Sequence, residues 1–208
     1  MESSIKFRLA KPSDARQIAK VQYSVRDKHP LGVFSQMDLC FLTKYYKITL
    51  NDPYEVVVCA ENEKREIVGF NSATLDSALQ LKTLKKHWLI LGLAAIPSII
   101  KNPRLIKTLL LRLKSTSKDS KEKFIYTEGA RGEFWAWRED APNALEAINL
   151  SQKSNKVMAA LGVSYIFIEV DLDNENVLKY HKAMKAVVEQ VITLPDGRQR
   201  ALLRKNVK

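Results

Sequence analysis

A nearly continuous apolar run at residues 163–170, placed between two helical patterns, restricts the fold of this chain more than any other feature. Such a run is typical of a strand in the middle of a sheet, with helices covering both faces. A helix is expected before it, over residues 143–161, with Gly162 at its end. Another helix begins after it, at Asp173 or Asn174. The sequence therefore predicts the α/β class.

The remaining patterns predict one sheet of mixed strand direction. The expected strands cover residues 5–10, 55–60, 67–74, 124–128, 133–138, 187–194 and 200–205. Two helices, one beginning near Pro12 and one capped by Ser35, separate the first two strands. Residues 77–123 interrupt this order with two more expected helices, 77–95 and 103–114. We expect one domain over residues 1–208 with a helical insertion at 77–123.

Composition excludes several classes of protein. Hydrophobic residues make up 46% of the 208-residue chain and charged residues 27%, as in an ordinary globular domain. Two cysteines exclude a disulfide scaffold, and three scattered histidines give no local metal motif, so no metal is expected. The first residues carry no apolar core of a signal peptide. We expect a cytoplasmic protein in a reducing compartment.

The positive charge of the chain is concentrated in the insertion. The formal net charge is +11, and residues 77–123 contribute +9 of it, with eleven basic and two acidic side chains. The apolar run at 88–100 is too short to cross a bilayer, because thirteen helical residues span about 20 Å. Three interpretations stay open: a solvated basic face, a peripheral membrane surface, or a docking site for an acidic acyl carrier protein. Trp88 is the one aromatic residue of its helical part, which disfavours a nucleic acid.

Several stretches in this order resemble the GNAT superfamily of N-acetyltransferases. They are residues 7–15, 60–70, 161–170 and 174–181, and the resemblance covers about 5–76 and 124–206. It implies a mixed, mostly antiparallel central sheet flanked by helices. It also implies an acyl thioester co-substrate, acetyl-CoA or another, and an amine on a small molecule as acceptor. An amino sugar is one such acceptor.

The donor-binding motif of the family departs from its pattern here. The family binds the pyrophosphate on a glycine-rich turn at a helix N-terminus, where backbone N–H groups surround the anion. The equivalent residues 138–148 contain no glycine. The resemblance implies that the donor is held by six residues: Trp135, Ala136, Trp137, Arg138, Asn143 and Asn174. The two tryptophans, one residue apart, should face the same side of their strand.

The resemblance also implies an acid and a base. The family often places a tyrosine seven residues after the asparagine, where it protonates the leaving thiolate; here that position is His181, with Tyr180 beside it. Glu133 takes the place of the carboxylate base that accepts a proton from the amine, and Glu128 is its rival. The expected activity is N-acyl transfer. The alternative is a catalytically inactive scaffold protein whose basic insertion contacts a membrane or an acidic protein.

Overall fold

The computed structural model describes residues 5–28, 32–115, 126–141, 145–194 and 196–208. Within them one seven-stranded sheet has the order β1-β2-β3-β4-β5-β7-β6. All neighbours are antiparallel except β4 and β5, which are parallel. The expected mixed, mostly antiparallel sheet is confirmed. The strands are β1 (Lys6–Leu9), β2 (Glu55–Glu61), β3 (Ile67–Thr74), β4 (Arg131–Trp137), β5 (Tyr165–Asp171), β6 (Val187–Thr193) and β7 (Gln199–Asn206).

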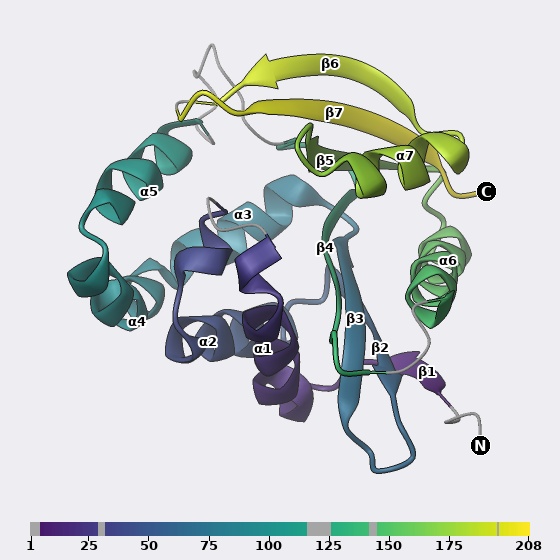
Figure 1. The fold of residues 1–208 in the computed structure, drawn as a ribbon, viewed down its shortest axis with the longest axis horizontal. Helices are drawn as coiled ribbons and strands as arrows, with labels where there is room; N and C mark the ends of the chain where they lie inside the picture. Colours follow the sequence, from purple (N-terminus) through teal and green to yellow (C-terminus); the bar gives the residue numbers. More distant parts are fainter. Residues whose placement is uncertain (1–4, 29–31, 116–125, 142–144, 195) are drawn as a thin grey trace.

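Helices cover both faces of this sheet, and Figure 1 shows α1 and α2 on one side of β2–β4 and α6 on the other. The helices are α1 (Ala15–Ser24), α2 (Leu39–Thr49), α3 (Ser77–Lys86), α4 (Trp88–Lys101), α5 (Arg104–Ser115), α6 (Leu145–Ala160) and α7 (Glu175–Ala183). On the α1/α2 side, Ile18, Tyr46 and Phe70 are almost completely buried in one apolar cluster. On the α6 side, Leu150 packs with Val58 of β2. The core is thus two layers separated by the sheet.

The chain between β1 and α2 shows how the sequence sets its helix starts. Asp14 accepts a hydrogen bond from the Lys11 amide (2.7 Å) and forms an ion pair of 2.6 Å with Arg8. These contacts fix the turn before α1, as the sequence predicts. The expected cap of the next helix is wrong: Ser35 lies in a 3-10 turn, and Asp38 caps α2 by accepting from the Phe41 amide (2.9 Å).

The insertion differs from its prediction in one respect. The expected helix over 77–95 is two helices, because α3 ends before His87 and α4 continues through Pro97 to Lys101. Ser98 of α4 is buried and its Oγ accepts from the Asp38 amide (2.9 Å). After α4, the Asn102 side chain donates to Gln36 Oε1 (2.8 Å). The insertion is therefore fastened to the segment that precedes α2.

The strand expected at 124–128 is not found. Its residues 126–128 form no strand, and 124–125 lie outside the described part of the chain. The Tyr126 amide instead donates to the Glu169 side chain (2.7 Å), and its ring stacks on Phe167 (4.3 Å between centroids). A side-chain acceptor takes the place of a strand partner.

Candidate active site

A cleft of about 310 Å³ opens between β4 and β5. Among the described residues, the parallel ladder of these strands is the single pair Arg131 and Phe167. Past this pair the strands separate, and residues 132–136 and 168–171 line the space between them. A splayed parallel pair exposes backbone groups that a continuous sheet would use. The cleft therefore offers both side chains and strand backbone to a ligand.

Glu133 lies at a bulge in β4. Ala73 pairs with Gly132 and Ser72 with Phe134, so Glu133 is an extra residue on its strand. In a regular strand Glu133 and Phe134 would point to opposite faces. Here Phe134 packs against Tyr45 (6.2 Å between ring centroids), and the pKa of Tyr45 is raised first by burial and next by the Glu133 carboxylate. The bulge thus turns both side chains toward α2.

A buried polar network holds the Glu133 carboxylate. Arg131 donates to Glu133 Oε1 (2.6 Å), to Gln80 Oε1 (2.9 Å) and to the Tyr126 carbonyl (3.0 Å). Although burial acts against it, the charges of Glu133 and Glu169 raise the pKa of Arg131. Burial, followed by the Glu133 charge, raises the pKa of Glu55 well above its ordinary range, which favours the protonated acid. The network fixes the direction in which the Glu133 carboxylate points.

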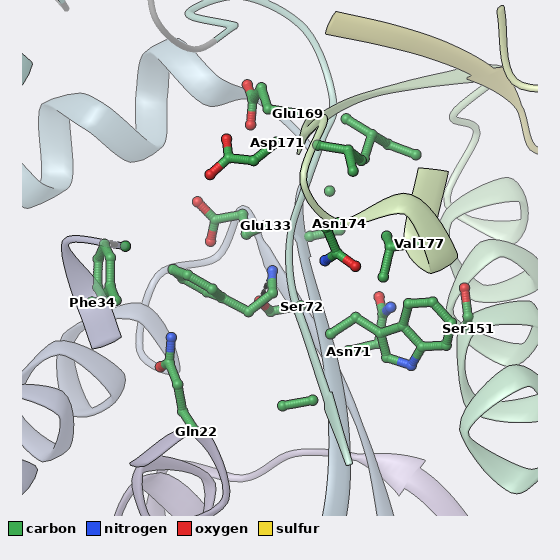
Figure 2. A pocket seen from close by; sticks show the side chains of 18 of the residues that line it. Gln22, Phe34, Asn71, Ser72, Glu133, Ser151, Glu169, Asp171, Asn174 and Val177 are labelled. Atoms are coloured by element: carbon green, nitrogen blue, oxygen red, sulfur yellow. Dashed lines mark hydrogen bonds between the residues drawn. The ribbon is translucent and has the colours of Figure 1, made fainter. Parts of the chain in front are cut away.

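Two further carboxylates lie on the same side of the cleft. Figure 2 shows Glu133, Glu169 and Asp171 directed into the space that faces Phe34. Asp171 is bound by Arg200 (2.6 Å) and by Arg198. Sequence reasoning missed Glu169 and Asp171, although charged residues two apart in an apolar strand were a signal that one face of the strand is not buried.

The opposite side of the cleft carries neutral polar groups. Figure 2 places Asn174, Val177 and Ser151 across β4 and β5 from the three carboxylates. Asn174 is the N-cap residue of α7 and lines the cleft, as does His181, seven residues or about two turns further along the helix. The structure therefore brings the expected Asn174, His181 and Glu133 to one cleft, with Glu133 on the carboxylate side.

His181, Tyr180 and Trp135 form an aromatic cluster at the α7 side of the cleft. The Trp135 ring lies 4.8 Å from that of Tyr180 and 6.4 Å from that of His181. Lys205 of β7 lies over Tyr180, with Nζ 5.5 Å from the ring centroid. Within the described ranges, His181 Nδ1, the Tyr180 hydroxyl and Lys205 Nζ are buried without a hydrogen-bond partner. These are three unused proton-carrying groups beside the cleft.

The charge state of this cluster follows from burial. Burial, assisted by the Lys205 charge, lowers the pKa of His181 to about 4. The ring is therefore neutral at neutral pH, whereas an unperturbed histidine would titrate near it. Burial also lowers the pKa of Lys205 to about 8. Lys205 is therefore mostly protonated at neutral pH and can supply a proton to the cluster.

The direction of the β4 backbone decides which amides face the cleft. The Phe134 amide donates to Ser72 Oγ (3.1 Å) and the Arg138 amide to the Val68 carbonyl (2.8 Å), so both point to β3. Amides alternate along a strand. Those of Trp135 and Trp137 therefore point toward β5, and that of Ala136 points to β3. Of the two residues, Trp135 lines the cleft, so its amide is the one placed to polarise a carbonyl oxygen there.

The tryptophans also confirm the predicted alternation. Trp135 and Trp137 both pack with Val58 and Leu150 on the α6 side. Trp135 lines the cleft and donates from Nε1 to the Ala147 carbonyl (3.1 Å), whereas Trp137 lies in the core, outside the lining. One tryptophan is thus a wall of the cleft and the other is packing.

The turn expected to hold the pyrophosphate is only partly described. Asn143 lies outside the described residues. Arg138 forms an ion pair with Asp140 (2.5 Å) and is not in the lining of the cleft. Lys28 forms an exposed ion pair with Glu139 (3.1 Å). The acids beside the turn therefore have basic partners. No group of three or more histidine, cysteine or acidic side chains suited to a metal occurs in the described part of the chain.

No family model matches the sequence, and no curated protein matches it. Solved structures share its fold. An N-acetyltransferase from Staphylococcus aureus Mu50 has 12% identity and a TM-score of 0.60, covering 99% of this chain and 100% of that chain. An acetyltransferase structure from Salmonella typhimurium, with its cofactor acetyl-CoA, has 8% identity and a TM-score of 0.59 over 99% and 95%. A spermidine N-acetyltransferase from Vibrio cholerae has 10% and 0.55 over 98% and 94%. The fold is that of these acetyltransferases, and it is shared with an acetyltransferase of the GNAT family from Desulfovibrio desulfuricans (12% identity, TM-score 0.59).

Proposed function

We propose that this chain, which has the fold of the GNAT acetyltransferases, transfers an acyl group from a thioester to an amine. The observation that carries the proposal is the cleft between β4 and β5, which has carboxylates on one side and is lined by Trp135, whose amide points toward β5. The Salmonella typhimurium structure, solved with acetyl-CoA, supports a coenzyme A thioester as donor. Spermidine, named for the Vibrio cholerae enzyme, supports an amine as acceptor.

The chemistry assigns one task to each side of the cleft. The amine enters on the side of Glu133, Glu169 and Asp171, whose carboxylate oxygens can accept hydrogen bonds from its N–H groups. Glu133 accepts its proton, directly or through a water molecule, and the nitrogen attacks the thioester carbonyl. The amide of Trp135 stabilises the oxyanion that forms.

Collapse of this intermediate breaks the carbon–sulfur bond, and the thiolate takes up a proton. His181 and Tyr180 are the proposed proton donors. Asn174, at the start of α7, holds the acyl thioester. His181 is neutral at neutral pH, so it carries no extra proton. A proton that it gave to the thiolate would have to be replaced from another group. Tyr180, whose buried hydroxyl carries a proton and has no hydrogen-bond partner among the described residues, is the stronger candidate of the two.

Calorimetric titration with acetyl-CoA and with free CoA, at two salt concentrations, tests the donor site. Micromolar binding that persists at high salt is expected. Binding that salt abolishes would mean that basic surface residues sense phosphate charge alone, and the proposal would fail. Glu133→Gln should then lower the acetylation rate of a responsive amine by about 10²-fold or more, with the exposed Glu128→Gln as matched control.

A catalytically inactive binding protein is the second candidate. One observation favours it: residues 138–148 contain no glycine, so a tight backbone cradle for a pyrophosphate is not encoded there. The same titration separates the two candidates. No binding of either ligand at any salt concentration, by a protein that is folded, would support the scaffold.

A further inference from the structure

Helix α4 exposes a large apolar face. No charged residue occurs between Trp88 and Ile100. One face, with Ala94, Ala95 and Ser98, is buried. The other carries four large side chains at intervals of four, three and four residues. We call it the α4 apolar face; it consists of Leu89, Leu93, Ile96 and Ile100, whose exposed fractions are 58%, 67%, 45% and 73%. A helix that is apolar on every side is normally buried, so this face lacks the apolar contacts that such a helix normally makes.

The α4 apolar face is fixed toward the outside. Leu91 and Ile99, on the inner half of the helix, pack against the core beside α2. The Ser98–Asp38 and Asn102–Gln36 hydrogen bonds hold the same half in place. Figure 1 shows α4 and α5 at the far side of α2 from the sheet. The helix therefore cannot roll its apolar face into the domain without losing these contacts.

Basic side chains lie at both ends of this face. Lys85 and Lys86 precede it, Lys101 and Arg104 follow it, and all four are exposed. Residues 77–111 contain six basic side chains and no acidic one. Trp88, 65% exposed, stands at the start of the helix next to the lysines. Large apolar residues flanked by tryptophan and by basic residues are typical of a helix that lies in a membrane interface.

We propose that the α4 apolar face docks on the surface of an anionic lipid bilayer. The helix would lie in the plane of the interface, because its fourteen residues span about 21 Å and a bilayer core is ~30 Å thick. Among the described residues, none of the helices has the length and apolar content of a transmembrane span. The lysines at its ends would reach the phosphates while the leucines enter the acyl boundary.

The wholly apolar character of the face favours a bilayer over a protein. Interfaces between proteins are only about 56–65% apolar and contain hydrogen bonds across the contact. The α4 apolar face offers no polar side chain over about three turns. An acidic protein partner would account for the lysines, but it would not account for the exposure of the apolar Leu93 and Ile100. The inference does not depend on the chemistry of the cleft.

Co-sedimentation of the full chain with lipid vesicles tests the proposal. Binding to phosphatidylcholine vesicles that contain phosphatidylglycerol is expected, and much weaker binding to pure phosphatidylcholine. Leu93→Glu should lower the partition coefficient at least tenfold. Leu161→Glu, at an equally exposed leucine (55%) at the end of α6, should leave it unchanged. Both sites are exposed, so both variants should keep the thermal unfolding midpoint.

Two measurements separate insertion from simple charge attraction. Bound protein should show a blue shift of tryptophan fluorescence that is lost in Trp88→Phe, because Trp135 and Trp137 do not face α4. Lys86→Gln and Lys101→Gln should each lower partitioning about fivefold, corresponding to ~1 kcal/mol for each basic residue near the surface.

Several results would overturn the proposal. They are absence of binding to either kind of vesicle, binding that Leu93→Glu leaves unchanged, and a monomer–dimer equilibrium that Leu93→Glu abolishes in place of vesicle binding. The last would assign the face to a second copy of the chain. Titration of Leu93→Glu with acetyl-CoA should match the parent chain, which keeps this test separate from that of the acyl transfer.

Discussion

Arg131 and Glu133 form an ion pair of 2.6 Å in which both side chains are almost completely buried, with 7% and 6% of their surface exposed. They stand two residues apart on β4, one at the last point where β4 meets β5 and the other at the bulge where the cleft opens. The pair therefore connects the residue that pairs with β5 to the carboxylate that lines the cleft.

Breaking this pair from one side should be costly. Arg131→Met leaves the Glu133 carboxylate buried without its partner, and the free energy of unfolding should fall by about 3–5 kcal/mol. The double variant Arg131→Met/Glu133→Leu should recover at least half of that loss, because no charge is left buried. Urea unfolding measures both. A single variant within 1 kcal/mol of the parent would show that water or another group replaces Arg131.

Acid should destabilise the protein through His181. The folded pKa is about 4 and the unfolded value is ~6.5, so between these pH values the unfolded chain binds more protons. The free energy of unfolding should therefore fall as pH is lowered from about 6.5 to 4, by up to about 3 kcal/mol from this residue. His181→Gln should flatten that part of the pH profile. A profile that keeps its slope in the variant would assign the effect to other groups.

Lys205 should lower stability at neutral pH. Burial lowers its pKa to about 8, against ~10.4 in the unfolded chain, so stability should rise as pH increases between these values. Lys205→Met should raise the free energy of unfolding at pH 7 by about 1–2 kcal/mol. It should also raise the pKa of His181, since the Lys205 charge is one of the two causes that lower it. Histidine NMR titration measures this, and an unchanged value would refute the coupling.

Two glycines give a matched pair. A Cβ on Gly69 would lie 2.3 Å from Cε3 of Trp137, so Gly69→Ala must displace that ring and should cost about 1–3 kcal/mol. A Cβ on Gly92, in α4, meets nothing within 4 Å. Gly92→Ala should stabilise the protein by about 0.5–1 kcal/mol through helix propensity. Thermal unfolding compares them, and equal effects would contradict the packing argument.

The sequence predicts elements with strong local signals. The hairpin of β2 and β3 follows from two valine-rich runs and a short polar connector, and α6 follows from its periodicity and from Gly162. His87 was not recognised as a break because the apolar period continues across it. The helix through Pro97 was likewise unexpected, and it persists because α2 packs against the buried side of α4.

The site was harder to predict than the fold. Glu133, Asn174 and His181 were found because the resemblance assigns them by position. The bulge could not be foreseen, since it depends on how β3 pairs with β4 and leaves no mark in the order of residues. Strand β5 was expected to be buried on both faces, but the cleft exposes Ile168 and Glu169 in part. Arg131, which lies between two of the expected strands, is the buried partner of Glu133.

The hydrogen bonds of Ser98 and Asn102 have a consequence for any attempt to dissect this protein. They end on Asp38 and Gln36, which adjoin Phe34 at the mouth of the cleft. A shortened chain without residues 77–115 would also expose the α2 side chains that α4 covers. The insertion and the Phe34 side of the cleft are thus linked through residues 34–38, and substitutions that reshape either should require compensating changes in the other.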